Sequence, residues 1–555
     1  RPEAIPERQP PEFVTETNQE VASQWAARVG NLHEPTKIGA TELPQGARII
    51  RVIEQEKTRD EGGLTDKQWQ CEFRRPWSED EFFKKAVRTL HPMEAEPAIP
   101  DRTKTAIINI LTQSAKDWTN SQLQNLAKIR KRAEELKERE DQAKTQVNDA
   151  VRRVNSQKRT LLTAELLRKI KYGDMDVAHR ILTGFPLVGT MTEVATFERR
   201  QPDDVLTGAD TIWLARTASA SRADLIQQVV NTTTDEVFRN IYKTTTDKES
   251  GEVKKGWADG PYTENQIHDI VGDKLWIAAR RFGVTQKEKI RQIDDFSEYS
   301  LNACTTVADK IPVAGIDAIA NHVKFWADKL LEARRHPEHV VTATLSTGEK
   351  IQGQVHPDYL VQDTKLVGKC IDLEAAYKQC PVAPAHSRHG IFALKNPDTH
   401  QAEFFIARSL PFGATASVHG FNRAAMALNY LMHENVGIPC THYFDDYTII
   451  VPEVLGSPAD ELTGQFLKEL GWEVKREKDK PTSDTFTALG VVFDLAAAVL
   501  NNDPSFEVRN KPTRIEEVCQ SIDAHLAREG MSPAEATELR GRLIFSNSQT
   551  YGRMA

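Results

Sequence analysis

Two adjacent acids lie in the turn of a predicted hairpin, in the segment Thr441-His-Tyr-Phe-Asp445-Asp446-Tyr-Thr-Ile-Ile-Val451. The apolar and aromatic residues on both sides predict two buried strands over residues 442–451, with the carboxylates at the tight turn between them. Neighbouring carboxylates at the edge of an apolar sheet raise each other's pKa, so a cation would stabilise them. Hard Mg²⁺ takes carboxylate oxygens and shares them with phosphates. An acidic turn that only faces water is the alternative, which this segment alone leaves open.

A third acid, Asp372, ends a predicted strand in Cys370-Ile-Asp372-Leu-Glu-Ala-Ala-Tyr377-Lys-Gln. One acid at a strand end is more often a helix N-cap than a ligand. However, Asp372 and Asp445, which are 73 positions apart (445 − 372), would meet if their strands lay side by side. Two such carboxylates could hold the two metal ions that stabilise the attacking and leaving oxygens of a phosphoryl transfer. The other Asp-Asp pairs, at 203–204 and 294–295, lack these flanks.

A basic hairpin is predicted from strands at Trp276–Val284 and Ile290–Ile293, with five cations placed at its tip: Arg280, Arg281, Lys287, Lys289 and Arg291. Such a run is usually a solvated turn. The alternative is a triphosphate clamp, because Arg grips phosphate with its planar fork and Lys as a point charge. Strand alternation puts Arg291 on one face with Ile293 and Asp295, while Ile290 points the other way.

A loop at Arg408-Ser-Leu-Pro411-Phe-Gly413 enters a helix whose first residues are small. Such a loop lets a flat base or sugar approach the backbone closely. By itself it is also an ordinary helix entry.

The elements that must position these residues are strands and helices without regular β-α-β alternation, which favours an α+β fold. From Leu123 to Lys171 there is no Pro or Gly, and apolar residues recur every three or four positions. This spacing, which Glu140 interrupts, predicts one long helix. We expect it to pack on its own domain, with an intermolecular coiled coil as the alternative. Further predicted elements are a strand at 47–55, a helix at 316–335, a hairpin at 339–355, strand-like stretches at 370–382 and 391–394, a helix at 415–432 and a helix at 515–543.

Composition excludes several classes of protein. The 555 residues carry a net charge of −8, so no overall basic field attracts nucleic acid and any such surface must be local. No stretch approaches the ~18 apolar residues of a membrane span. The six scattered cysteines, without a C-x-x-C pair, argue against a disulfide framework and a zinc knuckle. Cysteines without such pairs are typical of a reducing compartment, so we expect an intracellular protein, in the nucleus or the cytoplasm. The chain opens on Arg1, which suggests a fragment.

In their order along the chain, these segments resemble the reverse transcriptase family, the RNA-directed DNA polymerases of retroelements. Asp372 with Ala376 and Tyr377 is similar to the family's first palm motif. Leu410-Pro-Phe-Gly413 is similar to the second, and Tyr443-Phe-Asp445-Asp446 to the catalytic Tyr-x-Asp-Asp box. The resemblance covers about residues 270–495 and looks closest to retrotransposon-type enzymes.

The resemblance implies roles for individual residues. Asp372 and Asp445 would bind two Mg²⁺ ions, for which Mn²⁺ could substitute, and Asp446 would assist. Tyr377 would exclude a 2′-hydroxyl, and Lys478 would give a proton to pyrophosphate. Nucleotide contacts would come from Arg291, Lys287, Lys289, Tyr377, Phe412 and Gly413, and Leu489 and Gly490 would belong to the turn that grips the primer.

The implied architecture is a right-hand polymerase with fingers, an antiparallel-sheet palm and a partial helical thumb, preceded by a largely helical amino-terminal extension. The predicted divisions are a loosely ordered extension (1–115), a long helical segment (116–180), fingers with insertions (181–365), the palm (366–495) and the start of a thumb (496–555). The implied partners are an RNA or DNA template with its primer and deoxynucleoside triphosphates, without a membrane. The oligomeric state stays open, including coiled-coil association through residues 123–171.

Three alternative functions remain. An RNA-directed RNA polymerase shares the palm and the acids, although bulky Tyr377 opposes a ribose. A decayed or domesticated copy would bind nucleic acid without catalysis, although all three acids are present. If the chain were a structural protein built around the 123–171 helix, four motifs would occur in the order of the family by chance. Whether further modules belong to the full product cannot be read from the sequence.

Overall fold

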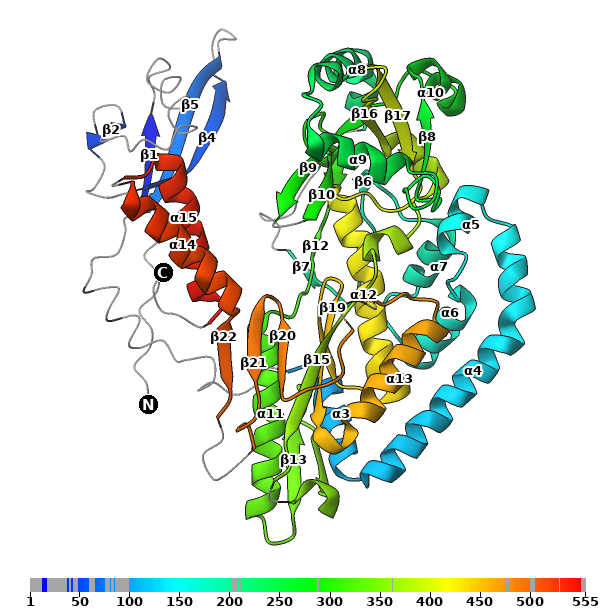
Figure 1. Cartoon of the computed structure of the whole chain (residues 1–555), viewed down its shortest axis with the longest axis vertical. Coiled ribbons are helices and arrows are strands. Elements are labelled where there is room, and N and C mark those ends of the chain that lie inside the picture. Colours follow the sequence, from blue (N-terminus) through cyan, green and yellow to red (C-terminus); the bar gives the residue numbers. More distant parts are fainter. Residues whose placement is uncertain are drawn as a thin grey trace. The chain divides into compact units, whose positions relative to one another are not determined.

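The computed structural model describes residues 99–200, 208, 211–286, 289–361, 363–475, 477, 479–499, 505–528 and 530–550, with residues 80 and 84 and five strands near the amino terminus (Figure 1). The chain divides into two compact units, Arg1–His91 and Pro92–Ala555. The first contains a three-stranded antiparallel sheet in the order β1 (Glu12–Glu16), β5 (Thr65–Arg74), β4 (Arg48–Thr58), and the pair β2 (Lys37–Ile38) and β3 (Thr41–Glu42). Strand β4 confirms the strand predicted at 47–55.

The second unit mixes helices and sheets, which confirms an α+β composition. Its helices are α3 (Asp101–Leu111), α4 (Ala115–Thr145), α5 (Asp149–Asn155), α6 (Thr160–Lys169), α7 (Asp176–Thr183), α8 (Ile212–Asn231), α9 (Glu236–Thr246), α10 (Glu264–Val271), α11 (Ile316–Arg335), α12 (Thr415–Val436), α13 (Gly456–Glu469), α14 (Pro512–Ala527) and α15 (Pro533–Ser548). Helix α3 corrects the predicted loose extension to residue 115, because it buries Ile107, Ile110 and Leu111.

A three-stranded antiparallel sheet in the order β15 (Leu366–Asp372), β19 (Asp446–Pro452), β18 (Cys440–Tyr443) lies at the centre of this unit. Helices α12 and α13 cover one of its faces: Tyr447 donates from its hydroxyl to the Ala425 carbonyl, and Lys369 pairs with Asp460. Figure 1 shows both helices beside these strands. Strands β15 and β19 are almost wholly buried, which matches their largely apolar sequence.

A five-stranded sheet, in the order β10 (Lys289–Asp295), β9 (Ala278–Gln286), β16 (Ile391–Lys395), β17 (Ala402–Ala407), β8 (Ala258–Tyr262), forms a second layer against α8 and α9. Strands β9 and β10 make the predicted basic hairpin. The third sheet is β20 (Thr485–Ala488), β21 (Val491–Asp494) and β22 (Glu507–Asn510). Two-stranded pairs are β13 (Val340–Thr344) with β14 (Lys350–Gln354), β6 (Gly189–Thr190) with β11 (Thr305–Thr306), and β7 (Glu198–Arg199) with β12 (Asp309–Lys310).

The long helix predicted over residues 123–171 is wrong, because the segment forms α4, α5 and α6. Glu140, the residue that interrupts the apolar spacing, is buried and caps α6: its carboxylate accepts from the backbone and hydroxyl of Thr160 and from the Leu161 backbone. Asn148 caps α5. The apolar stripe of α4 packs on α6, α12 and α13, so intramolecular packing uses the face that a coiled coil would need.

The helix predicted over residues 515–543 is also divided, into α14 and α15. Ser532 and Glu535 form a capping box with Pro533 at the first helical position, so the backbone restarts there. Of the strand-like stretch predicted at 370–382, only residues 370–372 lie in a strand, β15, which begins earlier, at residue 366. The strand does not continue, because Ala375 takes a left-handed conformation and a 3₁₀ turn follows. The helices predicted at 316–335 and 415–432 and the hairpins at 339–355 and 442–451 are confirmed.

Candidate active site

The structure brings the backbones of the three predicted acids together at one end of the β15-β19-β18 sheet. Asp372 lies directly opposite Asp446 in the antiparallel ladder, and the Leu373 backbone donates to the Asp445 carbonyl at 3.3 Å. Residues opposite each other share a face, with Cβ atoms ~5 Å apart. Because Lys369 and Tyr447 lie on the face covered by α12 and α13, alternation puts Asp372 and Asp446 on the opposite face.

Both chain segments that carry these acids contain a non-glycine residue with left-handed backbone. Phe444, the first of the two residues between β18 and β19, has φ 53°, and Ala375, three residues after Asp372, has φ 45°. Such conformations cost on the order of 1–3 kcal/mol and gather at functional sites. The strain fixes where the turn places Asp445 and how the chain leaves Asp372 toward Tyr377.

The charge of the acids reaches neighbouring side chains. Burial raises the pKa of the Cys370 thiol, and the charges of Asp446 and Asp372 raise it further. Burial also raises the pKa of Tyr377, with a further contribution from Asp445. Each of the three acids therefore lies within electrostatic reach of Cys370 or Tyr377.

The donor chemistry of the three acids fits a hard divalent cation, because only carboxylate oxygens are offered and two of the acids face each other across a ladder. Among the described residues, no group of three or more His, Cys, Asp or Glu side chains is arranged as a ready-made metal site. The cation and its geometry therefore belong to the proposal below.

Tyr377 lies in the 3₁₀ turn η4 (Ala376–Gln379) and is mostly buried. Its ring centroid lies 4.7 Å from that of Phe421, in a stacked arrangement, and 4.9 Å from that of Phe412. Phe412 is half exposed. The structure thus joins the aromatic residue of the first motif to the Pro-Phe-Gly loop, two segments that the sequence placed only in order.

Gly413 holds this loop against the basic hairpin. Its φ is +108°, and a Cβ there would collide with the backbone oxygen of Asp294. The Asp294 backbone donates to the Phe412 carbonyl at 3.0 Å. Close backbone approach therefore requires glycine at this position, whatever contact it makes with a nucleotide.

The predicted cluster of five cations at the hairpin tip needs correction. Arg280 and Arg281 pair in register with Asp295 and Asp294, at the end of the hairpin away from its turn. Arg281 is buried and ion-paired, because its guanidinium lies 3.6 Å from the Phe392 ring and contacts two carboxylates. Lys289 and Arg291 are exposed on β10, and Lys287 lies outside the described residues.

The predicted alternation of β10 is confirmed by burial. Ile290, Gln292 and Asp294 lie on the more buried face, and the Gln292 amide donates to the Ile241 carbonyl of α9. Arg291 therefore points away from α9.

Leu489 and Gly490, predicted to grip a primer, form the two-residue turn between β20 and β21. Their φ values of 47° and 81° match the twist that a two-residue hairpin requires. Lys478, the predicted proton donor, lies outside the described residues.

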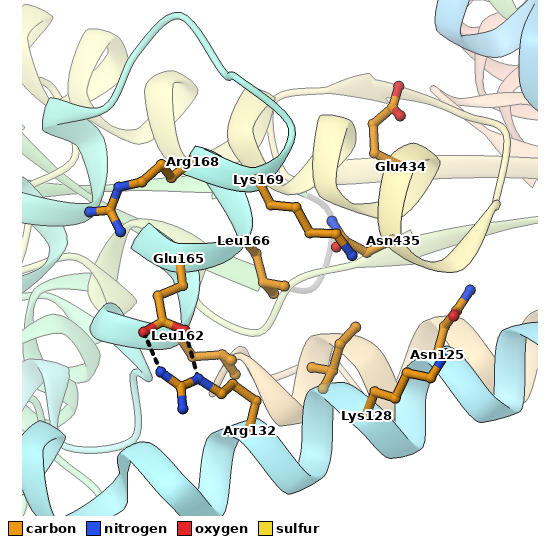
Figure 2. A pocket seen from close by; sticks show the side chains of 11 residues that line it. Asn125, Lys128, Arg132, Leu162, Glu165, Leu166, Arg168, Lys169, Glu434 and Asn435 are labelled. Atoms are coloured by element: carbon orange, nitrogen blue, oxygen red, sulfur yellow. Dashed lines mark hydrogen bonds and ion pairs between the residues drawn. The ribbon is translucent and has the colours of Figure 1, made fainter.

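A separate pocket of about 540 Å³ lies between α4, α6 and the end of α12 (Figure 2). Arg132 and Glu165 form a bidentate pair across it, with both N···O distances 2.8 Å. None of the predicted site residues lines this pocket, whose lining is Asn125, Lys128, Ile129, Arg132, Leu162, Glu165, Leu166, Arg168, Lys169, Glu434 and Asn435.

Sequence reasoning missed one group next to Tyr377. Glu252, between α9 and β8, accepts from Arg281 at 2.7 Å and from Lys378 at 2.9 Å. Burial opposes its charge, but Arg281 and Lys378 lower the pKa of Glu252 to about 2. No motif surrounds this residue, so only the packing of β9 against the loop shows it.

The comparison with known families agrees with the central part of this geometry. Residues 336–493 match the model of the family described as reverse transcriptase (RNA-dependent DNA polymerase). That stretch contains Asp372 and both acids of the hairpin turn. The match supports the reverse transcriptase family. It does not reach the basic hairpin, and it does not distinguish a retrotransposon type.

Among solved structures, the chain is similar to the foamy viral protease-reverse transcriptase dRH in complex with double-stranded DNA, with 11% identity and a TM-score of 0.34. The alignment covers 92% of this chain and 64% of that one, so this chain spans less than two thirds of that protein. No curated protein matches the sequence. In the described part of the chain, no helix is long and apolar enough to cross a bilayer.

Proposed function

We propose that this chain is the RNA-directed DNA polymerase of a retroelement, which adds deoxynucleotides to a primer 3′-hydroxyl on an RNA or DNA template. The observation that carries the proposal is the opposition of Asp372 and Asp446 across the β15–β19 ladder, with Asp445 in the adjoining turn. The family match over 336–493 includes all three positions. The proposal assigns fingers, palm and thumb to residues 181–365, 366–495 and 496–555.

Asp372, Asp445 and Asp446 would hold two divalent cations, Mg²⁺ or Mn²⁺. Two such ions, when bound, lower the pKa of the primer hydroxyl and neutralise the charge of the triphosphate and the departing pyrophosphate. The left-handed backbone at Phe444 and Ala375 would limit the reorganisation that these carboxylates need when cations and substrate bind.

The nucleotide would lie between the acids and the basic hairpin. Tyr377, held between Phe412 and Phe421, would exclude a 2′-hydroxyl by its bulk. Arg291 on the exposed face of β10 would contact the triphosphate, with Lys289 and Lys287 as flexible point charges nearer the turn. Lys478 would give the proton to pyrophosphate, and Leu489 and Gly490 would contact the primer end.

Primer extension on poly(rA)/oligo(dT), with Mg²⁺ and labelled dTTP, tests the proposal. We expect extension by the wild type and none by Asp445→Asn. Equal use of ribonucleotides would favour the RNA polymerase alternative. Duplex binding without extension would favour a non-catalytic nucleic-acid-binding protein, and either result would overturn the proposal.

A further inference from the structure

A closed ring of contacts joins the basic hairpin, the Pro-Phe-Gly loop and Tyr377. Asp294 binds Arg281 through both carboxylate oxygens, at 2.7 and 3.0 Å. Arg281 contacts Glu252, and Glu252 contacts Lys378, the residue after Tyr377. The ring closes through Phe412, which packs on Tyr377 and whose carbonyl accepts from the Asp294 backbone.

Charge balance makes Glu252 the bridge of this ring. Two cations, Arg281 and Lys378, face two anions, Asp294 and Glu252, and all but Lys378 are at least nine-tenths buried. Asp294 saturates one side of the Arg281 guanidinium, so Glu252 alone spans from Arg281 to Lys378. Without its charge, Lys378 would lose its anion and be drawn toward water, and the short 3₁₀ turn that holds Tyr377 would move with it.

We propose that Glu252 is a positioning residue for sugar selection: through Lys378 it fixes the Tyr377 ring relative to Phe412 and so sets the discrimination between deoxynucleotides and ribonucleotides. This inference rests on the proposed function, because it assigns Tyr377 to the sugar. Glu252 itself touches neither substrate nor metal. It lies outside the 336–493 stretch that matches the family.

The test compares Glu252→Gln and Lys378→Met with the wild type. The variant Tyr377→Ala shows how far discrimination against ribonucleotides falls when the side chain that would exclude the 2′-hydroxyl is removed. The readout is the ratio of kcat/KM for dTTP over UTP. We expect the ratio to fall about tenfold or more in the first two variants, since displacing a positioned group by ~1 Å can cost on the order of 100-fold. The loss should arise mainly from ribonucleotide gain and a raised KM for dTTP, with kcat less affected.

Glu140→Gln is the matched control, because Glu140 is also a buried, hydrogen-bonded carboxylate but lies on α4, where it caps α6. It should lower stability and leave the ratio within about twofold of wild type. The double variant Glu252→Gln/Lys378→Met restores charge balance around Arg281. It should therefore recover stability relative to Glu252→Gln without recovering sugar selection.

Hydrogen exchange separates this inference from the proposed function. The Lys378 and Cys380 amides donate to the carbonyls of Ala375 and Tyr377. Their exchange should be faster in Glu252→Gln than in the wild type, and it should not change in Glu140→Gln. An active wild type with an unaltered ratio in both single variants overturns the inference. If the wild type does not extend a primer, the proposed function fails by itself, and unchanged exchange at these amides would then overturn the coupling as well.

Discussion

Two of the Asp-Asp dipeptides lie among the described residues, one at the end of β10 and one where the β18–β19 turn enters β19, and their surroundings give them different roles. Asp294 is buried on β10 and neutralised by Arg281, while Asp295 accepts from the backbones of Ser297 and Glu298. Asp446 instead faces another acid, Asp372, and the charges there raise the pKa of Cys370. The first pair stabilises the fold through Arg281 and the turn that follows β10, and the second brings two carboxylates to opposite positions of one ladder. The residue directly opposite in the sheet differs between the two pairs: it is Arg281 for Asp294 and Asp372 for Asp446.

The largest expected effect comes from removing charge at the second pair. Asp445→Asn should reduce nucleotide incorporation by about 1,000-fold or more, because a bound cation supplies several kcal/mol of transition-state stabilisation and 1.4 kcal/mol is tenfold. Its thermal unfolding temperature should fall less than that of Asp294→Asn, because Asp445 is only partly buried whereas Asp294 is buried. Single-turnover extension and calorimetry check this. A large loss of stability would instead make the pair structural.

The same substitution at the first pair should act on stability. Asp294→Asn leaves the buried Arg281 guanidinium with Glu252 as its main anion and should cost about 3–5 kcal/mol of unfolding free energy. Asp295→Asn, the matched control, keeps an oxygen acceptor for its turn and should cost under ~1 kcal/mol. Urea denaturation measures both. Equal costs would contradict the division between the buried and exposed faces of β10.

The exposed face of β10 should carry binding in place of stability. Arg291→Ala should raise the KM for the nucleotide by an amount equivalent to about 1.5–3 kcal/mol, as expected for a lost charge-assisted contact. Lys289→Ala should do less, because it lies nearer the turn. Neither should shift unfolding by more than ~0.5 kcal/mol. Equal small kinetic effects would mean that the hairpin is a solvated basic turn.

The smallest expected effect is a change in how stability depends on pH, and it differs between the β15–β19 region and the β9–β10 region. His322 is fully buried on α11, which packs against β19, and burial lowers its pKa to about 3. Below about pH 6.5 the unfolded chain binds a proton at His322 and the folded chain does not, so the free energy of unfolding falls as the pH decreases from about 6.5 toward the folded pKa. His322→Leu should therefore reduce the pH slope of stability below 6.5 by about 1.4 kcal/mol per unit.

Glu252, which pairs with Arg281 of β9, is the control, because its pKa shift should affect stability only at lower pH. Its pKa falls from 4.5 to about 2, so its contribution is present above about 4.5 and is lost as pH falls through about 2. The stability difference between wild type and Glu252→Gln should thus stay constant from pH 7.5 to 5.5. Denaturation at several pH values decides both outcomes, and an unchanged slope in His322→Leu would contradict the first.

The sequence determined the elements whose pattern is local. Alternation and apolar runs located β9, β10, β18 and β19, because the burial pattern of a strand is visible in its own residues. The acid pair and Asp372 could be singled out because apolar strands end in them. Capping residues such as Ser532 and Pro533 also mark, in the sequence itself, the break between α14 and α15.

Only the tertiary structure decided what depends on distant partners. Glu140 seemed to interrupt a helix and instead caps another one, 20 residues later, so the long helix is three. Arg281 carries the same charge as Arg291 and has the opposite function, because Asp294 and Glu252 bury it. Glu252 has no local signal at all. Ion pairs are formed between side chains that folding brings together, and residue spacing along the chain does not encode which cation will meet which carboxylate.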